Sequence, residues 1–236
     1  MNKPSSGSAR NKPVLWAEAA YFLGLVILAL GTAWMERADF GMSMVVAPAY
    51  IVHRKLSQFW PWFTFGVAEY LLQAVLLVLL ATVQRQFKRA YLFSFVTAVL
   101  YGVVLDSMLW LTAFLPGGGM IARVLYYLAG LLLCSVGVAL LFYTDLPPEA
   151  YELVVKELAE RFSIPIARCK TIYDCTSCLV GVVLSFAFFG FGRFEGVKLG
   201  TVFCALINGT LIGWCSDLLQ EHFRMEDALT LRNRFR

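Results

Sequence analysis

Five acidic residues of this sequence lie inside otherwise apolar stretches, where a carboxylate is unusual. They are Glu18, Glu69, Asp106, Asp174 and Asp217. An ionised carboxylate in hydrocarbon is costly, so such groups usually face a bundle interior or a wet cavity, where they can bind a proton or a cation. Glu69 and Asp106 lie deepest in their stretches and are the main candidates for this chemistry, followed by Asp217. The alternative for each is a structural acid that hydrogen-bonds a neighbouring helix.

Other residue types offer less chemistry. Asn208 is a candidate for substrate contact, because an amide inside a membrane segment is costly unless it is paired. Cys175-Thr-Ser-Cys178, with Cys169 nearby, has metal-like spacing, but packing of small apolar side chains is the favoured explanation. The sequence has no phosphate-binding loop, no catalytic serine motif and no dinucleotide fingerprint. We therefore expect no enzyme, no cofactor and no metal site.

Six long apolar segments must position these residues. The chain is 59% hydrophobic and 15% charged, against about 25% charged in a soluble domain. Each segment approaches the ~20 residues with which a helix crosses a bilayer, and lipid cannot satisfy the backbone of an irregular segment. The predicted fold class is all-α, a polytopic membrane protein with six transmembrane helices. The segments are 14–35, 62–83, 90–115, 124–143, 172–191 and 199–219.

The basic residues predict the orientation. All 20 Lys and Arg residues fall outside the six segments, and most lie on one side if the N-terminus is cytoplasmic. The positive-inside rule therefore places both termini in the cytoplasm and predicts a multi-pass protein of the cytoplasmic (inner) membrane. The basic residues occupy separate loops rather than one face, so the chain is not expected to bind nucleic acid. Residues 1–13 are predicted to form a disordered tail, and 224–236 a basic cytoplasmic tail.

The two halves of the chain repeat each other. Three apolar segments per copy force the second copy to enter the membrane from the other side, which makes an inverted repeat, as in many secondary transporters. Repeat 1 is expected at 14–116, an outer linker at 117–121 and repeat 2 at 122–223. The matched residues are Tyr21, Gly24, Leu25, Gly31, Ala33 and Asp39 with Tyr127, Gly130, Leu131, Gly137, Ala139 and Asp145, and Gly102-x-x-x-Asp106 with Gly213-x-x-x-Asp217.

The repeated glycines predict where the halves meet. Gly24 and Gly31 in the first span, like Gly130 and Gly137 in the fourth, let helices approach closely. The first and fourth spans should therefore cross near a pseudo-twofold axis.

The repeated acids predict two gates. Asp39 and Asp106 lie toward the outer side of their copy, whereas Asp145 and Asp217 lie toward the inner side. We therefore predict an outer gate at the first pair and an inner gate at the second. The alternative for Asp39 and Asp145 is that they only end or cap helices.

A shorter segment follows the first span of each copy. In copy two, Pro147 and Pro148 precede an amphipathic pattern that ends at Phe162 and predicts a helix on the inner interface or packed against the bundle. The matching segment, 42–57, is more apolar and contains Pro48. It is either an interfacial helix or a re-entrant segment, and the sequence leaves both open.

Several motifs resemble those of a known family. Arg37-Ala-Asp39-Phe40-Gly41-Met-Ser43 is similar to the RADLG-x-S signature of the YczE/YyaS/YitT family of bacterial integral membrane proteins. Gly102-x-x-x-Asp106 resembles its G-x-x-x-D motif, and 198–213 resembles its G-x-G-T…AL-x-x-G-x-x-IG stretch. Phe40 replaces the family's Leu, and the Pro-Trp after the Ser is absent. The resemblance covers both copies and implies the membrane fold, but little about a substrate.

These observations predict secondary transport of a small cationic, zwitterionic or neutral solute by alternating access, with proton coupling through Asp106 and Glu69. No Lys or Arg lies in a predicted span, which disfavours a bare anion, although helix N-termini can also bind anions. The alternative is a non-transporting membrane subunit or sensor that acts through a partner protein. The expected partners are the solute and the lipid bilayer, and a homodimer is left open.

Overall fold

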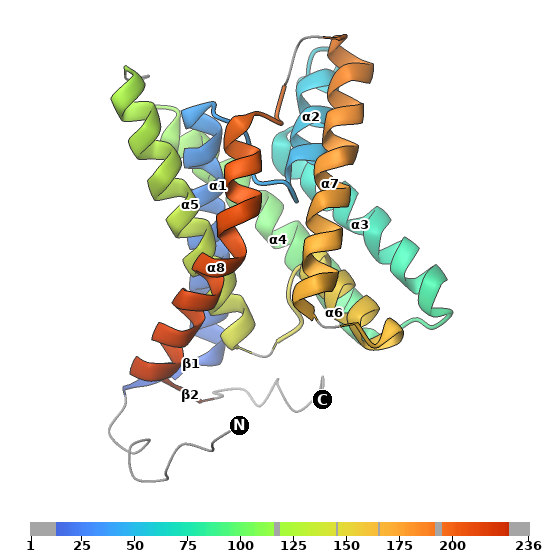
Figure 1. Ribbon diagram of the computed structural model, residues 1–236, viewed down its shortest axis with the longest axis vertical. Helices are drawn as coiled ribbons and strands as arrows, with labels where there is room; N and C mark the ends of the chain where they lie inside the picture. The colour runs from blue at the N-terminus through green and yellow to red at the C-terminus, as the bar shows by residue number, and fades with distance from the viewer. Residues whose placement is uncertain (1–12, 116–118, 145, 165, 192–194, 227–236) are drawn as a thin grey trace.

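The computed structural model describes residues 13–115, 119–144, 146–164, 166–191 and 195–226 (Figure 1). Within this part of the chain, six helices are long and apolar enough to cross a membrane. They confirm the all-α polytopic fold class and indicate a multi-pass membrane protein. The six are α1 (Ala17–Ala38), α3 (Phe65–Gln84), α4 (Arg89–Thr112), α5 (Met120–Tyr143), α7 (Ile166–Phe189) and α8 (Leu199–His222), and two shorter helices are α2 (Ala47–Leu56) and α6 (Ala150–Phe162).

Several helix ends differ from the sequence prediction. The first span was expected from residue 14, but Val14–Trp16 form strand β1, which pairs in parallel with β2 (Arg224–Glu226). The fifth span was expected from residue 172, whereas α7 already begins at Ile166. Hydropathy depends only on residue type, so it cannot show which polar residues have partners that allow them to lie in a membrane helix. Asp145, most of the two tails and residues 117–118 of the linker lie outside the described residues.

Helices α1 and α5 cross through their glycines, as the repeat predicts. A Cβ added to Gly24 would lie 3.1 Å from the carbonyl oxygen of Gly137, and one added to Gly31 would lie 2.7 Å from that of Gly130. Gly24 and Gly130 are counterparts in the repeat, and so are Gly31 and Gly137. Exchanging the two halves therefore maps each contact onto the other, which is the behaviour of a twofold axis at this crossing.

The short helices join the two repeats. α2 packs against α3 of its own repeat and α7 of the other, and α6 packs against α7 and α3 in the matching way. Ala47, Pro48, Ala49 and Ile51 are the buried residues of α2. The apolar face of α6 is likewise buried, through Tyr151, Leu153, Val154 and Val155 among others. Of the two settings expected for α6, packing against the bundle is the one observed.

The last two helices of each repeat break the symmetry. α3 packs closely along α4, whereas α7 and α8 touch at few positions and diverge in Figure 1. A Cβ added to Gly102 of α4 would lie 2.8 Å from the carbonyl oxygen of Gly66 in α3. The counterpart of Gly102 in α8 is Gly213, and no described atom lies within 4 Å of its Cβ position. The two repeats therefore share a fold but differ in conformation.

The two ends of the bundle can be named by what lies there. The small sheet and the C-terminal end of α8 mark the sheet end, at the bottom of Figure 1. The C-terminal end of α1 and the N-terminal ends of α5 and α8 mark the opposite end, called here the Asp39 end.

Candidate functional site

A small cavity of about 50 Å³ lies between the two repeats. Apolar residues of α1 and α5 form part of its wall, including Leu28, Val138 and Leu141. Polar groups reach it from five of the helices and from the segments that precede α2 and α6. They are Thr32, Ser43, Tyr101, Glu149, Tyr151, Glu152, Lys170 and Asn208. Because both repeats contribute to it, this cavity is the candidate binding site.

Glu69 of α3 lies directly behind the cavity wall. Its side chain has no exposed surface, and one carboxylate oxygen accepts a hydrogen bond from the Tyr151 hydroxyl at 2.7 Å. The other oxygen, Oε2, has no hydrogen-bond partner among the described residues. A charge at this position is expensive, because burial removes water without supplying a cation. Glu69 was selected from the sequence, and the structure connects it to the cavity through Tyr151.

Glu149 is a second buried acid, and Gln73 of α3 holds it in place. The Gln73 amide nitrogen approaches Glu149 Oε2 at 3.4 Å, and its carbonyl oxygen accepts the backbone N–H of Ala150 at 3.0 Å. Glu149 Oε1 has no partner among the described residues. Burial raises the pKa of Glu149 well above its usual range, and negative charge on Glu69 and Glu152 raises it further.

Lys170 enters the cavity wall from the first turns of α7. Its ammonium group donates to Glu152 Oε1 at 2.6 Å and lies 3.4 Å from Asp174 Oδ1. The expectation that no Lys or Arg lies in a membrane helix is therefore wrong for Lys170. The two acids, one on α6 and one a turn further along α7, supply the negative charge that allows the lysine to be there.

Asn208 of α8 reaches the cavity from the side opposite α6. Its side-chain oxygen accepts a hydrogen bond from the Ser135 hydroxyl of α5 at 3.2 Å. The sequence predicted a substrate contact for Asn208. The structure pairs its amide with Ser135 and places it in the cavity wall, and the substrate contact stays a prediction.

Asp106 and Asp217 lie elsewhere. Asp106 accepts the Thr64 hydroxyl at 2.5 Å and the Gly66 backbone N–H at 2.8 Å, so it binds the N-terminus of α3. A carboxylate is favourable there, because the helix dipole presents positive charge. These contacts are those of the structural acid that the sequence left open. Asp217 is exposed, and no described group pairs with it.

Sequence reasoning missed much of the site. Glu149 and Glu152 are not among the candidates selected from the sequence, yet both line the cavity. One signal was available in α3, where Glu69-x-x-x-Gln73 places two polar side chains one turn apart in an apolar segment. Their partners on α6 lie too far along the sequence to be found from spacing.

Residues 15–217 match the model of a family of unknown function, DUF6198. The chain belongs to the DUF6198 family. The match includes both repeats and every residue of the cavity wall. No curated protein and no solved structure matches the chain. Membership of DUF6198 assigns no ligand, and the resemblance to the YczE/YyaS/YitT family stays a prediction.

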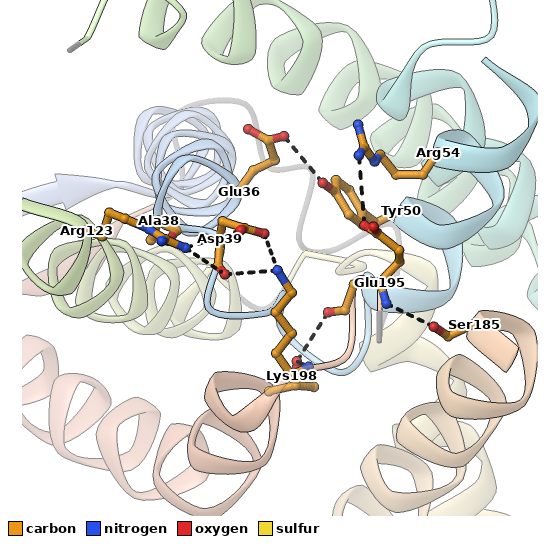
Figure 2. A network of polar contacts seen from close by, with 11 residues as sticks. Glu36, Ala38, Asp39, Tyr50, Arg54, Arg123, Ser185, Glu195 and Lys198 are labelled. Atoms are coloured by element: carbon orange, nitrogen blue, oxygen red, sulfur yellow. Dashed lines mark hydrogen bonds and ion pairs between the residues drawn. The ribbon is translucent and has the colours of Figure 1, made fainter. Parts of the chain in front are cut away.

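In this DUF6198 protein, Asp39 is the centre of a polar network at the opposite end of α1 from the sheet (Figure 2). Its carboxylate pairs with Arg123 of α5 at 3.2 Å and with Lys198, which precedes α8. Asp39 also ends α1, because its backbone adopts the left-handed conformation with φ 55°. Asp39 therefore ends a helix, which is the alternative that the sequence left open, and it also joins the two halves; its role in an outer gate stays a prediction.

Further pairs of the same DUF6198 network join the remaining elements at this end. The Tyr50 hydroxyl of α2 donates to Glu36 at 3.4 Å, and Arg54 lies 3.8 Å from Glu195. The backbone N–H of Glu195 donates to the Ser185 hydroxyl of α7 at 3.0 Å. Figure 2 shows these groups spanning the space between α1, α2, α5 and α7. The network ties the two repeats together at the Asp39 end.

Proposed function

We propose that this protein is a secondary transporter that moves a small cationic, zwitterionic or neutral solute by alternating access, coupled to protons through Glu69 and Glu149. The observation that carries the proposal is the cavity between two inverted repeats, with buried acids in and behind its wall. Solute sites of inverted-repeat transporters lie at such a repeat interface.

The two acids suit proton coupling because one carboxylate oxygen of each has no hydrogen-bond partner in the described part of the chain. A proton that binds there removes a charge from a dry site, and a proton that leaves restores the charge. Tyr151 links Glu69 to the cavity, and Gln73 links Glu149 to the start of α6. A solute in the cavity would therefore feel the protonation state of both acids at short range.

The charge balance of the wall supports the solute class. Lys170 is already neutralised by Glu152 and shares Asp174, so its positive charge is not free for an anion. The nearby acids exceed the single lysine in number, and this excess favours a solute with a positive group. The apolar part of the wall would suit its hydrocarbon portion.

The test begins with a thermal-shift screen of the purified protein against cationic and zwitterionic metabolites at two pH values. A ligand at 100 times its Kd adds about 2.7 kcal/mol to the stability of the folded state. Each hit is then assayed for uptake into proteoliposomes with and without an imposed proton gradient. Hits without gradient-dependent uptake would argue against transport and favour a sensor.

Glu69→Gln separates coupling from binding. The variant keeps a group that can pair with Tyr151 but cannot release a proton. We expect it to bind the solute and exchange it across the vesicle membrane, yet to lose acceleration by the proton gradient. Glu221→Gln, an exposed acid near the C-terminal end of α8, is the matched control. Full gradient-driven uptake by Glu69→Gln would remove Glu69 from the coupling site.

A further inference from the structure

One face of α8 has the small residues that are typical of a close helix contact, but no described helix packs against its two glycines. Ala205, Gly209, Gly213 and Asp217 recur every fourth residue and form this face, called here the glycine face. Both glycines and Asp217 are exposed. No described atom lies within 4 Å of the Cβ position of either glycine.

The repeat shows what covers the same face in the other half. The counterparts in α4 are Ser94, Ala98, Gly102 and Asp106, and the first two have no exposed surface. α3 lies on the part of this face formed by Gly102 and Asp106, whereas the Ser94 hydroxyl donates to the carbonyl oxygen of Pro148 before α6. A Cβ added to Gly102 would lie 2.8 Å from the Gly66 carbonyl oxygen and 3.1 Å from the Tyr70 ring. Asp106 completes the contact by binding the N-terminus of α3.

The counterpart of α3 is α7, which follows α6 as α3 follows α2. Aligning the acids Glu69 and Asp174 places Thr171 at the position of Gly66 and Cys175 at that of Tyr70. Both Thr171 and Cys175 are exposed. α7 therefore presents an uncovered face of its own, at the level where α3 meets α4.

We propose that the glycine face of α8 is the docking surface for α7 in a second conformation of this chain, in which Gly213 meets Thr171 and Cys175 as Gly102 meets Gly66 and Tyr70. Lys170 on α7 and Asn208 on α8 both line the cavity, so docking would close the cavity between them. By the symmetry of the repeats, α3 would then leave α4 and the Asp39 end would open. This inference rests on the proposed alternating access and names the contact that alternates.

A second copy of the chain is the rival occupant. Helices with small residues four apart often form dimers in membranes. A symmetric parallel dimer through this face would bring two Asp217 carboxylates together, and like charges repel. The matching contact between α3 and α4 already exists within one chain, and for this reason we favour α7.

Cysteine cross-linking tests the contact. The native thiol of Cys175 is combined with Gly213→Cys, and the protein in proteoliposomes is oxidised with copper phenanthroline. A disulfide requires Cβ atoms about 3.5–4.5 Å apart, which the present conformation does not provide. We expect a cross-link within one chain between Cys175 and the introduced thiol, identified by mass spectrometry of the peptides.

The matched control is Trp214→Cys, one residue further along α8. Trp214 is exposed, and so is its counterpart Val103, so this position is uncovered in both repeats. We expect no cross-link from it. A cross-link between two chains, equal cross-linking by the two variants, or none from a folded Gly213→Cys protein would each overturn the inference. Gly209→Cys replaces Gly213→Cys if the latter does not elute as a single species.

Uptake assays separate this inference from the proposed function. Gly213→Leu fits the present conformation, where space is open, but would block docking. We expect an unchanged melting temperature, loss of uptake, and labelling of Cys175 by maleimide that is at least as fast as in the parent protein, because docking no longer covers this thiol. Cross-linking without any solute uptake would leave the docking intact and remove transport. Uptake by a protein that never forms the cross-link would remove the docking alone.

Discussion

At the scale of single residues, the site is a set of acids that the fold buries without enough cations. Lys170 forms ion pairs with Glu152 and Asp174. Glu69 and Glu149 instead accept hydrogen bonds from Tyr151 and Gln73, respectively. A hydroxyl or an amide can accompany an acid in either protonation state, whereas an ammonium group favours the charged one. Lys170 and its two acids therefore form one ion cluster. Glu69, behind the cavity wall, and Glu149, in it, form no ion pair with any described residue.

The raised pKa of Glu149 predicts how stability depends on pH. The folded state holds this proton at pH values where the unfolded chain has released it. Protonated Glu149 therefore contributes fully to the stability of the folded state below the ordinary pKa of a glutamic acid. This contribution is lost as the pH rises through the raised pKa of the folded state. We expect the melting temperature in detergent to fall over this range, and to fall less in Glu149→Gln. Glu160→Gln, an exposed acid on α6, should behave as the parent protein.

Removal of the lysine tests the ion cluster. Lys170→Met would leave Glu152 and Asp174 partly buried without their cation, at a cost of about 3 kcal/mol. Denaturant unfolding followed by circular dichroism measures the loss. Adding Glu152→Gln to Lys170→Met should recover part of it, because one of the two uncompensated charges disappears. Arg168→Met, at an exposed position on the same helix, should change little; an equal loss there would contradict the assignment.

At the scale of elements, glycine counterparts distinguish the two repeats. A Cβ at Gly102 meets backbone of α3 that cannot move aside, whereas a Cβ at Gly213 meets open space. Overpacking a helix contact costs about 1–3 kcal/mol, and Ala is favoured over Gly within a helix by about 0.5–1 kcal/mol.

The resulting prediction compares Gly102→Ala with Gly213→Ala. The first should lower the melting temperature, and the second should keep or raise it. Differential scanning fluorimetry in the same detergent measures both. Equal destabilisation by the two variants would mean that α7 already lies on α8 in solution.

The contrast between glycines also shows what sequence could and could not supply. Gly24, Gly31, Gly130 and Gly137 predicted the α1–α5 crossing, because close backbone approach requires small residues wherever it occurs. Glu69 was found because an acid in an apolar segment is conspicuous. Tyr151 and Glu152, the partners of Glu69 and Lys170 on α6, are distant in sequence, so no local pattern points to them. The difference between Gly102 and Gly213 could not be predicted either, since the sequence encodes both packed and open arrangements with the same motif.

At the scale of the whole molecule, the Asp39 network holds the two repeats together at one end through weak bonds. The side chain of Asp39 is 62% exposed, and exposed ion pairs contribute about 0.2–1 kcal/mol each. Such a network can hold one end shut without making the closed state permanent, as exchange between two conformations requires.

Asp39→Asn should therefore shift the balance of conformations more than it shifts stability. We expect the melting temperature to change little, and the cavity thiol of Cys134 to react faster with an impermeant maleimide added from the Asp39 side. Peptide mapping identifies the labelled residue. Glu226→Gln removes an ion pair with Arg224 at the sheet end and is the control. Unchanged labelling in Asp39→Asn would mean that the network does not gate access.

The pairing of the three-residue strands β1 and β2 requires an even number of membrane crossings between them. Val14 pairs with Arg224 and Trp16 with Glu226, so the two strands occupy one aqueous compartment. The polypeptide between them must then return to the side from which it started, and any path with an odd number of crossings is incompatible with the sheet. A split fluorescent reporter, with one fragment attached beside each strand, should reassemble whichever compartment that is.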